Sequence, residues 1–187
     1  DFDTLLRNAD IAMYQAKGAG RNVVRFFDPD MQAVLEAHTT LESDLRRALV
    51  ERQFSLYYQA QVDDAGRIIG AEALVRWIHP QHGIIPPAQF IPIAEESSLI
   101  IGIGHWVLET ACRQLALWGN DEKKCNLELA VNVSARQFKS RDLVDKVAAV
   151  IKEQRVDPSR LKLELTESVV LENIADVVAK MHALKAL

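Results

Sequence analysis

Cysteine is scarce in this sequence, and its scarcity limits the sites and compartments that suit the chain. The 187 residues include two cysteines, Cys112 and Cys125, whose spacing fits neither a CxxC metal site nor a disulfide framework. A reducing compartment, the cytoplasm, therefore suits the chain. The sequence also has no signal peptide and no initiator methionine, so we expect a piece of a longer protein, with the nature of any upstream sensor or membrane domain left open.

Long apolar runs and an excess of basic residues are also missing. No run approaches the roughly 18–20 apolar residues that cross a bilayer, so we expect no membrane segment in this chain. The 26 Asp and Glu residues outnumber the 22 Lys and Arg residues, and this balance argues against nonspecific binding of duplex nucleic acid. At 49% hydrophobic, the chain can nevertheless bury a core.

The first part of the chain predicts two helices around a short strand. Apolar stripes predict helices over 3–17 and 30–51, and residues 22–27 predict the strand between them. One helix and one strand cannot form a domain, so we interpret residues 1–27 as the remnant of one. The second helix does not keep a heptad, which favours the entry helix of a further domain over a coiled-coil linker.

A hairpin follows. Residues 53–62 alternate between polar and apolar as a strand does, residues 67–77 form the central strand, and the short turn between them carries Gly66. Residues 78–87 are punctuated by Pro and Gly and predict a loop.

Two histidines lie in this predicted loop. His79 and His82 could form a metal pair, but Pro80 lies between them and a third ligand is missing from the motif. We therefore interpret both as surface histidines.

Helices and strands alternate through the rest of the chain. We expect two helices, 90–99 and 104–118, around a break at Gly102 and Gly104. The elements expected after them are a strand over 127–134, a helix over 136–154, a strand over 161–167 and a helix over 169–187. Such alternation indicates parallel strands joined by right-handed crossovers. The large apolar residues expected in the core are Trp106, Leu108, Leu115, Leu117 and Trp118.

Several short motifs lie between Leu41 and the end of the chain. They are Tyr57-Tyr58-Gln59, Glu72-Ala73-Leu74-Val75-Arg76-Trp77, His79-Pro80, Phe90-Ile91-Pro92, Asn132-Val133-Ser134 and Glu164-Leu165-Thr166-Glu167-Ser168. In these motifs the chain resembles EAL domains, the bacterial cyclic di-GMP phosphodiesterases, although that family commonly has Pro where this chain has Ala60. The resemblance implies an α/β fold, a (β/α)8 TIM-like barrel. Because such a barrel takes about 250 residues, we expect a truncated barrel of roughly its first half.

Three strands each carry a polar residue near the C-terminal end, opposite the apolar row: Glu72, Asn132 and Glu164. In a parallel barrel the apolar row packs on the helices, the other row points into the lumen, and active sites lie where the strands end. Converging carboxylates need a cation, and oxygen ligands suit Mg²⁺ or Mn²⁺ rather than zinc. We predict such a site; the alternative is that each residue pairs separately, for example Glu72 with Arg76.

The resemblance assigns roles to individual residues. It implies Glu72, Asn132 and Glu164 as metal ligands, and Gln59 and Arg76 as substrate contacts with the guanidinium on a phosphate. In the family, two cations activate a water that hydrolyses cyclic di-GMP to linear pGpG.

Glu167 is the remaining residue that the resemblance places at the active site, where it would hold a loop near the metals. A carboxylate at a helix N-terminus, favoured by the helix dipole, is a compatible reading of the same residue. The family site also needs an aspartate pair after a fifth strand and a later lysine, which these 187 residues do not include. We therefore expect no hydrolysis by this chain alone.

The beginning of the chain resembles the end of a GGDEF diguanylate cyclase domain, in the stretches 12–17 and 20–22. That resemblance implies Lys17 and Arg21 on nucleotide phosphates. We favour the alternative that both are solvated cations at a helix C-terminus. The expected domains are a GGDEF remnant over 1–27, a linker helix over 28–40 and the N-terminal part of an EAL domain over 41–187.

A half barrel leaves an open sheet edge at Leu161–Thr166, which invites pairing with another chain, so we expect a homodimer or oligomer. Two alternatives to a phosphodiesterase are open: a degenerate domain that binds cyclic di-GMP without cutting it, and a dimerisation module without a ligand. The presence of all three proposed metal ligands and of Arg76 favours the phosphodiesterase.

Overall fold

The computed structural model describes residues 1–18, 22–165 and 174–187, and its chain forms two compact units, Asp1–Leu45 and Arg46–Leu187. None of the helices in the described part of the chain is both long and apolar enough to cross a membrane.

The first unit contains helix α1 (Phe2–Gly18) and the greater part of helix α2 (Pro29–Val50), as predicted. Ile11 and Ala12 of α1 are buried, and the Tyr14 and His38 rings pack edge to face with centroids 5.9 Å apart. The predicted strand over 22–27 is wrong, because residues 23–28 have no strand conformation. Val24 and Phe26 there are 83% and 85% exposed, so an apolar run without a pairing strand stays irregular.

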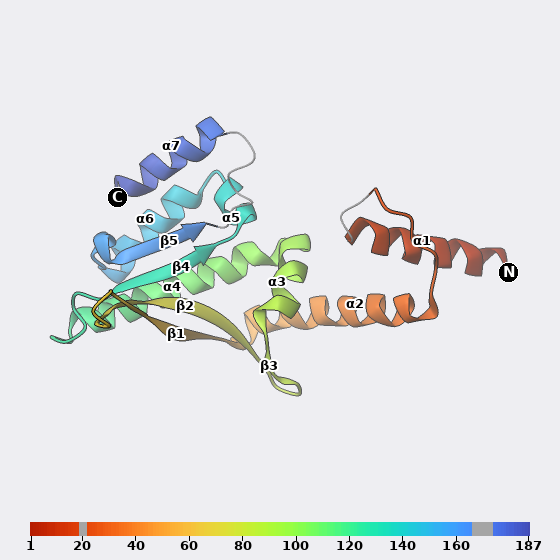
Figure 1. Ribbon diagram of the computed structural model, residues 1–187, viewed down its shortest axis with the longest axis horizontal. Helices are drawn as coiled ribbons and strands as arrows, with labels where there is room; N and C mark the ends of the chain where they lie inside the picture. Colours follow the sequence, from red (N-terminus) through yellow and green to blue (C-terminus); the bar gives the residue numbers. More distant parts are fainter. Residues whose placement is uncertain (19–21, 166–173) are drawn as a thin grey trace. The chain divides into compact units, whose positions relative to one another are not determined.

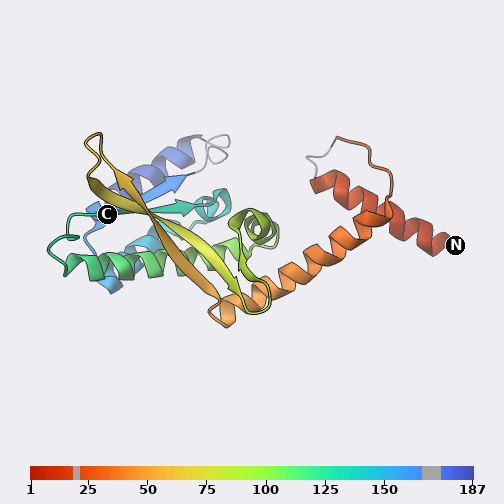
Figure 2. The same ribbon diagram turned by 60° about the horizontal axis from the view of Figure 1, so that its bottom comes forward.

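The second unit is built on one mixed sheet (Figures 1 and 2). Its strands are β1 (Phe54–Val62), β2 (Ile68–His79), β3 (Gly83–Ile85), β4 (Glu128–Val133) and β5 (Leu161–Leu165). The order is β1-β2-β4-β5, with β3 paired to β2. The predicted hairpin is confirmed, since β1 and β2 are antiparallel, and the predicted parallel pairing is confirmed for β2 with β4 and β4 with β5. The chain thus has the mixed α/β architecture that was expected.

The hairpin turn follows from its residues. The Asp63 carboxylate accepts hydrogen bonds from the backbone N–H groups of Ala65 and Arg67, at 3.0 and 2.9 Å. Gly66 adopts φ 75°, a left-handed conformation that glycine reaches at little steric cost. Figure 2 shows the two long strands twisting about each other from this turn.

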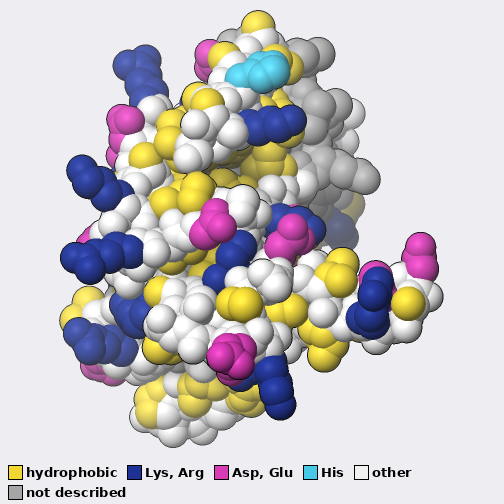
Figure 3. Space-filling view, turned by 90° about the vertical axis from the view of Figure 1, so that its left-hand side faces the viewer, with side chains coloured by type: hydrophobic (Ala, Val, Ile, Leu, Met, Phe, Trp, Pro, Cys, Tyr) yellow, Lys and Arg dark blue, Asp and Glu magenta, His cyan; other side chains and the backbone are white. Residues whose placement is uncertain are grey.

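Helices cover one face of the sheet. They are α3 (Pro87–Glu96), α4 (Leu99–Gly119), α5 (Ala135–Lys139), α6 (Leu143–Gln154) and α7 (Ile174–Lys185), with a 3-10 turn at Pro158–Arg160 before β5. The buried face of the sheet is the predicted apolar row, which includes Ala71, Ala73, Trp77, Leu129, Val131 and Val133. Seen from the end where β4 and β5 begin, the surface carries basic and acidic side chains interspersed with apolar ones (Figure 3).

The predicted helix break at Gly102 and Gly104 is wrong, because α4 runs through both glycines. The chain instead turns at Ser97 and Ser98, where Ser98 has φ 66° and so cannot continue α3. Leu117 was expected in the core, but it is 61% exposed near the end of α4.

The loop and the single helix predicted at 78–87 and 136–154 also need correction. β2 extends to His79, and β3 returns against it within the expected loop. The expected helix over 136–154 is interrupted between α5 and α6, where Ser140 takes an extended conformation.

His79 is a buried residue rather than a surface histidine, with 2% of its surface exposed. Its Nδ1 accepts the backbone N–H groups of Gln81 and His82, at 3.1 and 3.2 Å. The His79 ring thereby shapes the turn between β2 and β3.

Candidate functional site

The predicted polar residues lie on the face of the sheet opposite the buried row, and the strand register places them in order. Gln59 on β1 is directly opposite Glu72 on β2, and Asn132 on β4 is directly opposite Glu164 on β5. Glu72 is opposite Ala130, two residues before Asn132, so all four side chains share one face.

Glu72 and Asn132 meet directly. The Asn132 Nδ2 donates a hydrogen bond of 2.6 Å to Glu72 Oε1, between neighbouring parallel strands. Glu72 is half-buried and Asn132 is exposed. A carboxylate and a carboxamide therefore converge on one point near the end of the parallel pairing between β2 and β4. Glu72 lies in the first half of β2 rather than near its C-terminal end as predicted, because β2 continues to His79.

Arg76 lies two pleats further along the same face of β2. Its guanidinium carbon is 5.6 Å from the centre of the Tyr57 ring, within cation–π range, and its Nη1 donates to the Val75 carbonyl at 2.9 Å. The alternative prediction paired Glu72 with Arg76. In the structure Glu72 instead contacts Asn132, and Arg76 contacts Tyr57. A planar cation stacked on an aromatic ring keeps most of its donors available to an anion.

Glu164 is half-buried next to the last described residue of β5, Leu165, and lies on the same side as Asn132. Glu167, the third carboxylate of the prediction, lies outside the described residues, and so does Arg21. Lys17 is in the last turn of α1. This position agrees with the alternative interpretation of Lys17 as a cation at a helix C-terminus.

The chemistry of this set suits a hard cation. Glu72 and Glu164 supply carboxylate oxygens, and Asn132 supplies an amide oxygen when its carboxamide is turned, which fits Mg²⁺ or Mn²⁺. Among residues 1–18, 22–165 and 174–187, no group of three or more His, Cys, Asp or Glu side chains could hold a metal ion. The set of two glutamates and one asparagine is therefore the candidate in this part of the chain, and it is a partial one.

A cavity of about 260 Å³ opens beside this face, between the ends of β2 and β4 and helices α3 and α4. Its lining includes Arg76, Ile91, Glu95, Val107, Asn132 and Ser134. Two of the predicted site residues, Arg76 and Asn132, thus border space large enough for part of a ligand.

Residues 42–187 match the model of the EAL domain family. The chain belongs to the EAL domain family. The bifunctional diguanylate cyclase/cyclic di-GMP phosphodiesterase MucR of Pseudomonas aeruginosa is 45% identical to it over 184 residues, which are 98% of this chain and 27% of MucR. The cyclic di-GMP phosphodiesterase PdeR of Escherichia coli is 39% identical over 173 residues, 92% of this chain and 26% of PdeR.

A solved structure agrees with the family assignment and the fold. The structure of the PaMucR phosphodiesterase with c-di-GMP has a TM-score of 0.75 at 44% sequence identity, covering 79% of this chain and 60% of that chain. This EAL chain spans about a quarter of the length of the curated relatives named above.

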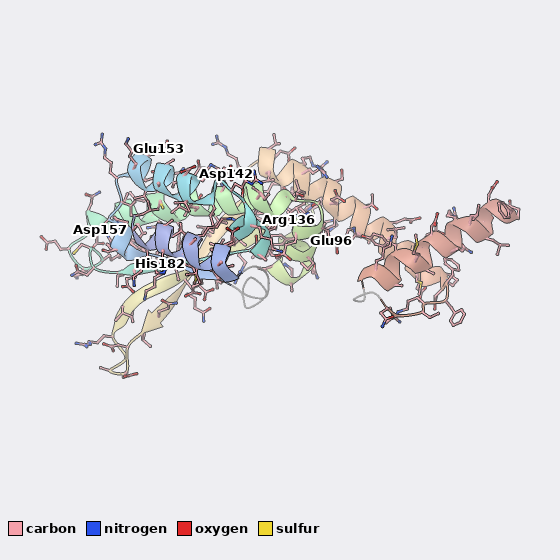
Figure 4. All side chains as sticks on the ribbon, turned by 90° about the horizontal axis from the view of Figure 1, so that it is seen from above. Glu96, Arg136, Asp142, Glu153, Asp157 and His182 are labelled. Atoms are coloured by element: carbon pink, nitrogen blue, oxygen red, sulfur yellow. The ribbon has the colours of Figure 1, made fainter. Side chains whose placement is uncertain are left out.

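The contacts that hold α5 of this EAL domain beside Asn132 were not predicted from the sequence. Ser134 Oγ accepts the Gln137 N–H at 3.2 Å, while Gln137 Oε1 accepts the Ser134 N–H at 3.2 Å, a reciprocal capping box. Arg136 donates to the carbonyls of Glu95 and Glu96 at the end of α3, and Figure 4 shows Arg136 beside Glu96. The Ser134-x-x-Gln137 spacing was the available signal.

Proposed function

We propose that this chain carries the first half of the active site of a bacterial cyclic di-GMP phosphodiesterase. The observation that carries the proposal is the 2.6 Å contact between Glu72 and Asn132, with Glu164 in register beside Asn132. Three oxygen-bearing side chains from three neighbouring parallel strands then face the same side, where barrel enzymes place their active sites.

Glu72, Asn132 and Glu164 would hold a divalent cation, Mg²⁺ or Mn²⁺, of which the intact family site contains two. Such a cation, when bound, lowers the pKa of a water and stabilises charge on a phosphoryl oxygen. The Arg76 guanidinium would bind and orient a phosphate of cyclic di-GMP, held in place by its contact with Tyr57. Gln59 would contact the substrate from β1, opposite Glu72.

The expected reaction of the intact protein is hydrolysis of cyclic di-GMP to linear pGpG, with Glu167 holding a loop near the metals. The names of MucR and PdeR support this substrate. The aspartate pair and the lysine that the family resemblance requires lie beyond the motifs of these 187 residues. This chain by itself is therefore proposed to bind cyclic di-GMP with a divalent cation and not to hydrolyse it.

Residues 1–27 are proposed to be the end of a preceding GGDEF domain. The match to MucR, which is named as a diguanylate cyclase as well as a phosphodiesterase, covers 98% of this chain and so includes most of that segment. We assign no nucleotide contact to Lys17 or Arg21 on this basis. A cytoplasmic location is proposed with this function, because cyclic dinucleotide signalling requires access to the cytoplasmic nucleotide pool.

Calorimetric titration of the 187-residue chain with cyclic di-GMP, with and without Mg²⁺, tests the proposal. We expect saturable binding that is tighter with Mg²⁺, and loss of the Mg²⁺ effect in Glu72→Gln and Glu164→Gln. Glu153→Gln, which removes one exposed carboxylate from α6, is the matched control and should bind as the wild type does.

Two results would oppose the proposal in different ways. Binding that is absent with and without Mg²⁺ would reject the nucleotide site and favour a module without a ligand. Binding that is equally tight with and without Mg²⁺ would reject the metal site and favour a degenerate cyclic di-GMP receptor. Chromatography of the same mixtures for pGpG tests the expected absence of hydrolysis.

A further inference from the structure

Gly104 occupies an unfavourable place for a glycine. It is buried in the second turn of α4, inside the helix, where glycine is the least favourable residue after proline. Its φ is not in the left-handed region that would require glycine. Backbone geometry therefore does not explain this residue, and its reason must be sought in what packs against it.

The neighbour of Gly104 is the side chain of Gln137. A Cβ atom at residue 104 would overlap Nε2 and Cδ of Gln137 and lie 2.5 Å from its Oε1. Such an overlap is relieved by displacing the end of the flexible Gln137 side chain rather than the backbone of α4. The missing side chain at residue 104 is thus what leaves room for the Gln137 carboxamide.

The Gln137 carboxamide acts on the end of β4. Its Oε1 accepts both the backbone N–H and the hydroxyl of Ser134, at 3.2 and 3.0 Å, and Ser134 comes two residues after Asn132. This contact holds Ser134 in an extended conformation, with φ −69° and ψ 156°, as the chain leaves the strand.

Backbone pairing holds Asn132 on one side only, because the β5 ladder includes it and the β2 ladder does not reach it. The last parallel pair between β2 and β4 is Ala73 with Val131, so Asn132 lies beyond the backbone pairing to the strand that carries Glu72. Toward β5 Asn132 pairs with Glu164, so on the side of β2 the support given by Ser134 contributes to whether the Asn132 carboxamide reaches Glu72.

We propose that Gly104 and Gln137 are positioning residues for Asn132: the gap left by Gly104 admits the Gln137 carboxamide, which holds Ser134 and so directs Asn132 toward Glu72. The part of this inference that concerns a metal ion rests on the proposed function. The part that concerns the Asn132–Glu72 contact does not, and it is tested without any ligand.

The first test compares Gly104→Ala with Gly102→Ala by NMR of the full 187-residue chain. A Cβ at Gly102 would lie 3.3 Å from Leu49 Cδ1, a distance that a small shift relieves, so the control makes the same substitution in the same helix without touching Gln137. In Gly104→Ala we expect a displaced side-chain amide signal of Asn132 and about tenfold faster hydrogen exchange of the Ser134 N–H. Gly102→Ala should change neither signal.

The second test alters Gln137 itself, so it does not depend on whether Gly104→Ala folds. Gln137→Ala removes the acceptor and should reproduce the changes in the Asn132 and Ser134 signals. Gln137→Glu keeps an acceptor oxygen at the third helical position, so both signals should stay as in the wild type. The double variant Gly104→Ala with Gln137→Ala should show the same Asn132 and Ser134 signals as Gln137→Ala alone. The Cβ at residue 104 then has no Gln137 side chain to overlap. A purely structural role would lower stability without moving the Asn132 signal.

Titration with Mn²⁺ alone, followed by electron paramagnetic resonance, extends the test to the metal. Gly104→Ala and Gln137→Ala should bind Mn²⁺ about tenfold or more weakly than the wild type, and Gly102→Ala should match the wild type. A wild-type chain that binds no Mn²⁺ would reject the proposed function and leave the NMR comparison to decide the positioning role. An unchanged Asn132 signal in both Gly104→Ala and Gln137→Ala would overturn the inference.

Discussion

The Asn132 carboxamide donates a 2.6 Å hydrogen bond to the Glu72 carboxylate, although 60 residues separate the two in the chain. The contact arises because β2 and β4 are parallel neighbours and both residues lie next to the last pair between them, Ala73 with Val131. The tips of Glu72 and Asn132 thus meet on the polar face of the sheet, and Glu164 lies in register beside Asn132. The shared metal site of the three residues stays a prediction.

Arg76→Lys should weaken the binding of cyclic di-GMP in the presence of Mg²⁺ by about tenfold, or ~1.4 kcal/mol. A lysine keeps the charge but loses the planar donor fork and the stacking on Tyr57, 5.6 Å away. Isothermal titration calorimetry measures the change. Arg67→Lys in the exposed hairpin turn is the control and should bind normally, and an unaltered affinity in Arg76→Lys would remove Arg76 from the phosphate site.

The two thiols should react at very different rates. Cys112 is completely buried in α4, and burial raises the pKa of its thiol to about 11, so little thiolate forms at pH 8. Ellman's reagent at pH 8 should therefore label one thiol per folded chain quickly and the second only in urea. The fast reaction should vanish in Cys125→Ser and persist in Cys112→Ser; a fast reaction in Cys125→Ser would contradict the burial of Cys112.

Asp142 should make stability depend on pH in acid. The Lys146 ammonium, 2.8 Å from its carboxylate, and the Ser140 hydroxyl lower the pKa of Asp142 from 3.8 to about 2. A lowered folded pKa means that this stabilisation is present above pH 3.8 and is lost as the pH falls toward 2. The fall in the urea midpoint between pH 5 and pH 2.5 should be smaller in Asp142→Asn than in the wild type.

Removing Lys146, the partner of the Asp142 carboxylate, provides a second check of the role of Asp142. Lys146→Met should also reduce the acid sensitivity, because the main cause of the lowered Asp142 pKa is then absent. The idea fails when Asp142→Asn and the wild type lose stability equally over this pH range.

Arg160→Met should lower the free energy of unfolding by about 1.5–3 kcal/mol. The Arg160 guanidinium donates to the carbonyls of Leu127 and Lys124, at 2.9 and 3.2 Å, and so joins the beginnings of β4 and β5. Urea unfolding measures the loss. Lys152→Met on the exposed side of α6 is the control, and equal stabilities of the two variants would show that the carbonyl contacts contribute nothing.

The outer position of β5 in the order β1-β2-β4-β5 predicts self-association through that strand. Sedimentation velocity should detect a dimer or larger species whose share grows with protein concentration. A single monomeric species across the concentration range would contradict the prediction.

The glycines of α4 illustrate where a local interpretation fails. Gly102 and Gly104 together predict a break, yet α4 continues through both. At Gly104 the Gln137 side chain occupies the space that a Cβ would need. A glycine that breaks a helix and one that admits a neighbour look the same in a sequence. His79 is a similar case, since a histidine beside Pro80 reads as loop although its ring is buried under the turn it caps.

The sequence by itself determined the alternation of strands and helices, the hairpin of β1 and β2, the parallel strands, and which residues of each strand are polar on the face away from the helices. Those properties follow from side-chain periodicity, which is local. Only the tertiary structure decided that Asn132 reaches Glu72, that Arg76 stacks on Tyr57, and that Gln137 fits against Gly104. Each of these depends on strand register or helix packing, and both are fixed by contacts between segments far apart in the chain.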